Sequence, residues 1–161
     1  SEIDQIMLLI SGKLTWIPLY ILIIYIIFKK FSNKFIWIII SLSLLIFLSD
    51  FGSVHLFKDV FERLRPCHQL ERVRIVNECG GLYSFISSHA SNSFAIAFFV
   101  SIILKNIRIF IFLFSWATII GYSRVYLGVH FPFDIIGGMF WGLFVSLLTY
   151  MLLKSRINES I

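Results

Sequence analysis

Apolar stretches alternate with short polar connections along most of the chain, and this pattern predicts helices that cross a membrane. Five windows carry little charge, and they cover residues 14–28, 35 to about 55, 85–104, 109–123 and 131–153. A helix needs about 20 residues to cross a hydrocarbon core of about 30 Å, and several windows fall short of that length. We therefore expect about five spans, of which the last, closed by Lys154 and Arg156, has the clearest end.

The composition of the 161 residues agrees with a membrane protein. Apolar residues make up 58% of the chain and charged residues only 14%, whereas soluble domains carry about 25% charged residues. Five apolar windows in succession leave too little polar sequence to cover a soluble globule. Residues 1–13 differ, because Glu2 and Asp4 stand beside apolar neighbours, as is typical of a short amphipathic helix at the membrane interface. No repeat or linker divides the sequence, so we predict one all-α transmembrane helix bundle over residues 1–161.

Basic residues indicate which side of the membrane each connection faces. The short connections and the tail carry Lys29, Lys30, Lys34, Lys105, Arg108, Lys154 and Arg156. Because cytoplasmic loops are enriched in lysine and arginine, these connections are expected inside, and the loops at about 56–84 and 122–131 then share the outer face. The net charge of +5 does not indicate nucleic-acid binding, because the basic residues are divided between both faces and form no continuous stripe.

Two cysteines, Cys67 and Cys79, lie in the longer outer loop. In an oxidising compartment they would form a disulfide that stabilises the fold by about 3 kcal/mol. Two unpaired buried thiols are the alternative. A disulfide would agree with an outward-facing loop.

The same loop begins with the segment KDVFERLRP. Lys58 and Arg65 are two helical turns apart, so a continuous helix would place both cations on one face, about 10 Å apart along the axis. Pro66 disfavours helix at residue 65, so we expect the helix to end there and to leave Arg65 at its terminus. The alternative is a solvated helix with ion pairs between residues 58 and 62 and between residues 59 and 63.

A second polar segment, SFISSHASNSF, stands where the third apolar window begins. Its hydroxyl and amide side chains suit a helix N-cap, and the free N–H groups of a helix start bind oxyanions. His89 would lie within the first turn. An ordinary serine-rich cap with an interfacial histidine is the alternative.

A third segment, GYSRVYLGVHFPFD, precedes the last window. Pro132 suits the first position of a helix, so His130 is expected just before that helix and Asp134 within its first turn, where the carboxylate can accept a proton from the imidazole. A capped helix with an Arg124/Asp134 pair is the alternative. Charged groups at a bilayer boundary are costly, and both outer loops place them on one side. We therefore expect the loops to form one site that processes an anion.

Three motifs in these segments resemble the signatures of a known family. They are Lys-x6-Arg-Pro at residues 58–66, Ser-x-His at 87–89 and Ser-Arg-x5-His-x3-Asp at 123–134. In this order they resemble the type 2 phosphatidic acid phosphatases, which are integral membrane lipid phosphatases whose motifs are shared with vanadium haloperoxidases. Ile86 and Ser88 depart from the family's usual Pro-Ser-Gly-His. The family typically has six spans, so either a first span lies outside this sequence or the N-terminal piece lies on the surface.

The resemblance implies a mechanism. His130, oriented by Asp134, would attack phosphorus and form a phosphohistidine, while His89 would donate a proton to the leaving group. The residues expected to bind phosphate are Lys58, Arg65, Ser87, Ser88 and Arg124. No metal or other cofactor is expected, because the four aspartates form no paired-carboxylate cluster that could hold two metal ions. Asp50 suits either a partner for a cation or a marker of the helix end.

The expected substrate is an amphiphile whose phosphate rests at headgroup depth. Polyprenyl pyrophosphate, phosphatidylglycerol phosphate, phosphatidic acid and lipid A 1-phosphate are all candidates. We expect a bacterial inner membrane, a site that faces the periplasm or exterior, and no obligate protein partner. A lipid phosphotransferase with the same intermediate is an alternative. A transporter is disfavoured, because the charged groups concentrate in the two outer loops.

Overall fold

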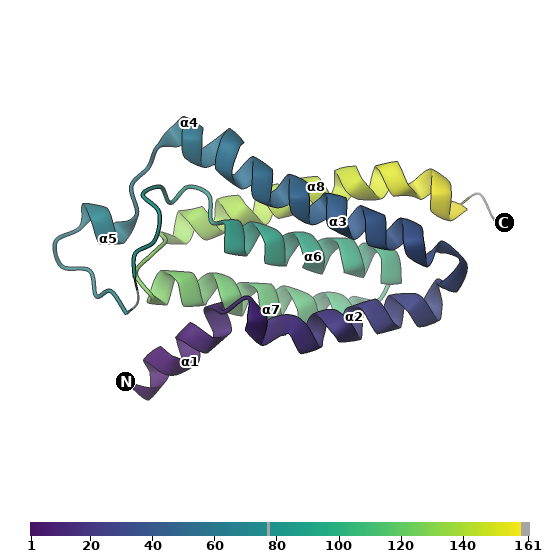
Figure 1. The fold of residues 1–161 in the computed structure, drawn as a ribbon, viewed down its shortest axis with the longest axis horizontal. Helices are drawn as coiled ribbons and strands as arrows, with labels where there is room; N and C mark the ends of the chain where they lie inside the picture. The colour runs from purple at the N-terminus through teal and green to yellow at the C-terminus, as the bar shows by residue number, and fades with distance from the viewer. Residues whose placement is uncertain (77, 159–161) are drawn as a thin grey trace.

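The computed structural model describes residues 1–76 and 78–158, which fold as a helix bundle (Figure 1). The helices are α1 (Glu2–Ser11), α2 (Ile17–Lys30), α3 (Phe35–Gly52), α4 (Asp59–Phe61), α5 (Pro66–Gln69), α6 (Ser88–Leu104), α7 (Ile107–Tyr126) and α8 (Pro132–Asn158). In the described residues, β-structure is limited to one isolated bridge between Leu64 and Tyr83. The predicted all-α class is confirmed, and each predicted window overlaps one of the helices α2, α3, α6, α7 and α8.

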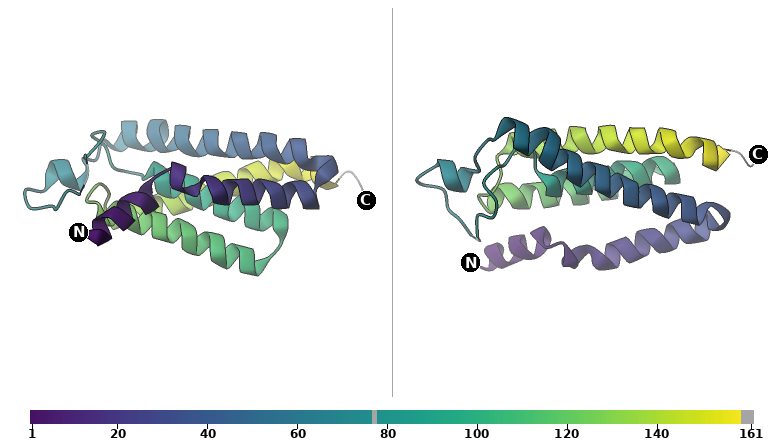
Figure 2. Two further views of the ribbon diagram at one scale, coloured as in Figure 1. Left: turned by 60° about the horizontal axis from the view of Figure 1, so that its bottom comes forward. Right: turned by 45° about the horizontal axis from the view of Figure 1, so that its top comes forward.

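The long helices run side by side, and their connections gather at two opposite ends (Figures 1 and 2). The N-terminus, the long loop that contains α5 and the start of α8 lie at one end. The turns after α2 and after α6 lie at the other end, near the end of α8. The basic connections therefore share one end of the bundle, as the charge pattern requires. That this end faces the cytoplasm stays a prediction.

The helices differ in their capacity to cross a membrane. In the described part of the chain, three segments are long and apolar enough, namely Ser32–Phe61, Ile107–Tyr126 and Pro132–Arg156. The number rises to four if α1 and α2, which are bent by 72°, form one span. The helix α6 is apolar but has only 17 residues. It lies in the middle of the bundle, where its neighbours shield it from lipid, so its length need not match the bilayer.

Close packing between α6 and α8 depends on two glycines. A Cβ atom at Gly138 would lie 2.9 Å from the carbonyl oxygen of Ser87, and one at Gly142 would lie 2.7 Å from that of Ser91. Small residues let membrane helices approach closely enough for their backbones to make contact. The contact matters for the site, because α6 begins next to His89 and α8 begins just after His130.

The predicted amphipathic N-terminal helix is present as α1. Its apolar side chains Ile6 and Leu9 are exposed, whereas Asp4 is buried. The Asp4 carboxylate accepts hydrogen bonds from Arg74 at 2.6 Å and from the Tyr126 hydroxyl at 2.9 Å. Hydrogen bonds thus join the polar side of α1 to the long loop and to α7, while the apolar side of α1 points away from the bundle.

The helix predicted to end at Arg65 ends earlier, so this prediction is wrong. A π-helical turn over Ser53–Lys58 leads into α4, and Glu62 then adopts a left-handed conformation with φ of 45°. The next residues bond to the distant end of the loop, where the Arg65 amide donates to the Leu82 carbonyl at 3.0 Å. Long-range pairing therefore satisfies backbone groups that a continued helix would have used. Arg65 instead precedes α5 as its N-cap residue.

Candidate active site

The three polar segments meet at one end of a single cavity of about 1070 Å³. The polar residues that line this end include Lys58, Arg65, Ser88, His89, Arg124 and His130. Away from that end, the cavity continues between α2 and α3, where its lining is mainly apolar and includes Ile23, Leu42 and Ile46. The cavity therefore has a cationic end, which contains His89 and His130, and an apolar trough, which lies between α2 and α3.

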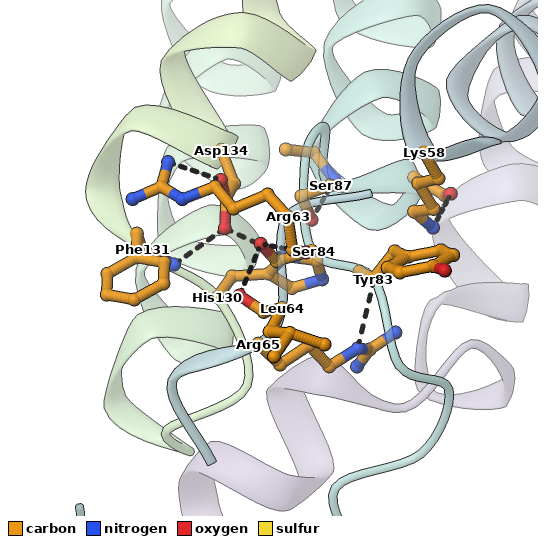
Figure 3. Close-up of polar contacts among 12 residues, drawn as sticks. Lys58, Arg63, Leu64, Arg65, Tyr83, Ser84, Ser87, His130, Phe131 and Asp134 are labelled. Atoms are coloured by element: carbon orange, nitrogen blue, oxygen red, sulfur yellow. Dashed lines mark hydrogen bonds and ion pairs between the residues drawn. The ribbon is translucent and has the colours of Figure 1, made fainter. Parts of the chain in front are cut away.

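Asp134 organises the loop before α8 (Figure 3). Its carboxylate has no exposed surface, and its Oδ2 atom lies 3.4 Å from Nδ1 of His130 and accepts a bond from the Phe131 amide at 2.8 Å. Burial lowers the pKa of His130 to about 4, and the hydrogen bond to Asp134 opposes that shift. At neutral pH the imidazole is therefore neutral. With Nδ1 held by the carboxylate, Nε2 is the nitrogen left for chemistry.

The start of α6 holds the second polar segment. Ser87 is fully buried, and its hydroxyl caps the helix by accepting a bond from the Ala90 amide at 3.4 Å. Ser87 itself lies outside the cavity lining. The Ser87 amide donates to the Asp134 carbonyl at 3.0 Å, which joins this segment to the loop before α8. The unusual Ser88 adopts a helical conformation at the first position of α6, so a glycine is not required there.

Lys58 is positioned by a chain of hydroxyl groups. Its ammonium group donates to the Ser88 hydroxyl at 2.8 Å, and that hydroxyl also bonds to the Ser53 hydroxyl at 2.6 Å. The alternative pairing of residue 58 with residue 62 is therefore not formed. The carboxylate of Asp59 bonds to His55 at 2.8 Å rather than to residue 63.

Arg65 is held by the loop on both sides of it. Its guanidinium donates to the Cys79 carbonyl at 3.0 Å and to the Tyr83 carbonyl at 3.3 Å. The structure pairs Cys67 and Cys79 in a disulfide, with their Cα atoms 6.0 Å apart. The disulfide thus joins the segment that follows Arg65 to the segment that accepts its hydrogen bond.

Arg124 lines the cavity from the C-terminal part of α7. Its guanidinium donates to the Ser11 hydroxyl, which fastens the C-terminal part of α7 to the end of α1. Its Nε atom is buried and has no hydrogen-bond partner among the described residues.

Sequence reasoning missed two basic residues at the site. Arg63 donates to the Asp134 carboxylate at 3.3 Å, and its guanidinium lies 4.1 Å from the centre of the Phe131 ring. The only sequence signal was its place inside the first motif. Lys13, from the connection between α1 and α2, lines the cavity. No local pattern marks Lys13, because its contact with the site depends on how α1 packs.

The structure also places Asp50 and one group of possible metal ligands. Asp50 is exposed to the cavity, and its Oδ1 atom accepts a bond from the Asn92 side chain at 3.1 Å. In the part of the chain that the structure describes, one group of possible metal ligands is close together, formed by Cys67, His68 and Cys79. Both sulfurs of this group belong to the disulfide and are not available as thiolates.

Comparisons with known proteins agree with this arrangement. Residues 35–157 match the model of the PAP2 superfamily. The chain is 34% identical over 155 residues to the lipid A 4'-phosphatase of Bacteroides thetaiotaomicron, covering 92% of this chain and 69% of that protein. It is 35% identical over 153 residues to the lipid A 4'-phosphatase of Porphyromonas gingivalis, covering 92% of this chain and 65% of that one. These curated relatives are therefore longer than the present chain.

The fold also matches a solved membrane protein. The crystal structure of Aquifex aeolicus LpxE superimposes with a TM-score of 0.73 at 27% identity, covering 92% of this chain and 86% of that chain. The arrangement of helices is therefore shared over nearly the whole of the present sequence.

Proposed function

Because the chain belongs to the PAP2 superfamily, we propose that it is an integral membrane lipid phosphatase. In this proposal it hydrolyses a phosphomonoester or pyrophosphate of a lipid at the outer face of the membrane. One observation carries the proposal, namely the cavity that joins His89, His130 and a group of basic side chains to an apolar trough between α2 and α3. A lipid phosphate has this same division, with its charge at one end and its hydrocarbon at the other.

The proposed reaction has two steps. In the first, Nε2 of His130 attacks phosphorus, the N–P bond forms and the bond from phosphorus to the lipid oxygen breaks. His89, which becomes protonated when the anionic phosphate binds beside it, gives that oxygen a proton. In the second, water attacks the phosphohistidine, His89 accepts a proton from the water, and the N–P bond breaks to release inorganic phosphate. The low pKa of His130 keeps its imidazole neutral for the attack.

The cations supply the electrostatic part of the catalysis. Lys58, Arg65 and Arg124 line the same end of the cavity as both histidines. We assign them to the phosphoryl oxygens, where fixed positive charges stabilise the transition state without having to reorganise. Ser88 positions Lys58, and Ser87 contributes by capping the helix whose first-turn amides face the anion.

The donor set also supports a reaction without a metal ion. The cationic side chains of Lys58, Arg65 and Arg124 at the polar end repel a divalent cation. Of the two carboxylates near this end among the described residues, Asp134 is fully buried and already bonded to His130, Phe131 and Arg63. The other, Asp50, lines the cavity alone and offers no second carboxylate for a two-metal site. We therefore propose that the fixed cations take the electrostatic role that metal ions have in two-metal phosphatases.

Phosphate release from a panel of lipid phosphates in detergent, with EDTA present, tests the proposal. The parent protein is expected to remain active, His130→Ala to lose activity to background, and His89→Ala to lose about 10²- to 10⁴-fold, the range of general acid catalysis. His68→Ala, an exposed histidine in α5, is the matched control and should retain activity. Loss of the parent's activity under EDTA, with recovery on adding a divalent ion, would refute the metal-free mechanism. Activity in folded His130→Ala would refute its role as nucleophile.

A further inference from the structure

Asp50 is an acidic side chain in a cavity otherwise suited to anions. It lies within Ser32–Phe61, a segment long enough to cross a membrane, and its exposed carboxylate lines the cavity. Ionised groups at membrane depth are costly and usually functional. Neither proposed step of the phosphatase reaction uses Asp50 directly, although its negative charge attracts the ammonium group of Lys58. That attraction acts on every substrate alike, so it does not by itself make Asp50 selective.

One oxygen atom of the Asp50 carboxylate is available to accept a hydrogen bond from a ligand. Asn92 donates to Oδ1 of Asp50 at 3.1 Å, while Oδ2 has no hydrogen-bond partner among the described residues. Asn92 follows His89 by three residues on α6, which corresponds to about 4.5 Å along the helix axis. The Asp50–Asn92 pair thus lies about one turn beyond the catalytic histidine, between the cationic end and the apolar trough.

The position of this pair corresponds to a definite part of a bound lipid. With the phosphate beside His89, the first few atoms beyond the phosphate ester reach the depth of Asp50. In a polyprenyl phosphate those atoms are hydrocarbon, and covering a carboxylate with hydrocarbon costs free energy because the group loses water without gaining a donor. A lipid with a hydroxyl or amide N–H on these atoms would instead donate a hydrogen bond to Oδ2.

We propose that Asp50, held by Asn92, is a specificity-determining residue of this site. It selects lipid phosphates that carry a hydrogen-bond donor on the carbon atoms next to the phosphate ester, and it disfavours polyprenyl phosphates. This inference rests on the proposed phosphatase function. A purely structural role, in which the pair only ties α3 to α6, makes a different prediction because it would affect all substrates alike.

A matched pair of substrates separates these roles. One is a 1-acylglycerol 3-phosphate, whose 2-hydroxyl is a donor, and the other is its analogue with hydrogen in place of that hydroxyl. The parent protein should favour the hydroxyl-bearing lipid by about tenfold or more in kcat/KM, as expected for a hydrogen bond to a charged group. Asp50→Leu should bring this ratio close to one by losing activity on the hydroxyl-bearing lipid, with activity on the analogue retained.

Two further variants complete the experiment. Asp50→Asn keeps a neutral acceptor and should give an intermediate ratio, which also serves if Asp50→Leu does not fold. Ser43→Ala changes another polar residue of the cavity lining, on the same helix, and should leave the ratio as in the parent.

The possible outcomes are distinguishable. An equal loss on both substrates in the Asp50 variants, an unchanged ratio in them, or a parent that hydrolyses both lipids equally would overturn this inference and leave the phosphatase proposal intact. A folded parent that releases phosphate from neither lipid, nor from the wider panel, would instead overturn the proposed function.

Discussion

Replacement of Arg63 by alanine tests whether this residue, which lies outside the cavity, positions the carboxylate of Asp134 against the nucleophile His130. Arg63 lies outside the cavity lining, its side chain is 37% exposed, and it donates to the buried Asp134 at 3.3 Å. A hydrogen bond to a charged group contributes about 1.5–3 kcal/mol, and a cation over an aromatic ring adds about 0.5–1 kcal/mol. Since the bond is long and the side chain half-exposed, we take about 2 kcal/mol for the sum.

If this energy serves to hold Asp134 against His130, Arg63→Ala should lower kcat by up to about 30-fold. KM should change little, because Arg63 does not contact the cavity. The pH profile supplies a second readout. Removal of a positive charge next to Asp134 lets the carboxylate stabilise the imidazolium more strongly, so the pKa of His130 should rise from about 4. Because the attack needs neutral imidazole, the acid limb of kcat/KM should move to higher pH.

The assay is phosphate release at a series of substrate concentrations and pH values. Arg63→Lys should recover part of kcat, because lysine keeps the charge but loses the planar group over Phe131. Arg72→Ala, an exposed arginine of the same loop, is the control. A rise in KM with kcat unchanged would show that Arg63 binds substrate directly. An acid limb identical to that of the parent would contradict its proposed action through Asp134.

Two further predictions concern the framework of the site. The double variant Cys67→Ser/Cys79→Ser should lower kcat/KM as well as the thermal midpoint, because the disulfide joins the segments that hold Arg65; unchanged kinetics in the folded double variant would show that the hydrogen bonds of Arg65 suffice. Gly142→Leu should destabilise the bundle by about 1–3 kcal/mol or more, because its side chain would enter the contact between α8 and α6. Thermal unfolding in detergent measures this, with Gly81→Ala, where an added Cβ meets nothing within 4 Å, as the control.

Much of the helical framework could be predicted because it depends on local properties of the chain. Each apolar window became a helix. In the absence of water, an apolar segment of that length can satisfy the hydrogen bonds of its backbone N–H and C=O groups only by forming a helix. The start of α8 was likewise local, because Pro132 and Asp134 act within one turn of the helix. The same short spacing explains why the contact between His130 and Asp134 was expected from the sequence and is present in the structure.

Interactions between distant segments could not be predicted in this way. A helix that extends as far as Arg65 was locally reasonable, but the bridge between Leu64 and Tyr83 gave the backbone other partners. That pairing depends on how a long loop closes. The partner of Arg63 depended on the same closure, because Asp134 lies 71 residues away. Local spacing had instead suggested a partner four residues back.

The sequence by itself therefore determined that the chain forms apolar helices, that basic connections share one end of the bundle, and which residue types could process an anion. Only the tertiary structure decided that Lys13 and Asp50 line the same cavity as the catalytic histidines and that Arg63 supports Asp134. The physical reason is range: helix formation depends on neighbours within a few turns, whereas a cavity exists only after helices distant along the chain have packed together.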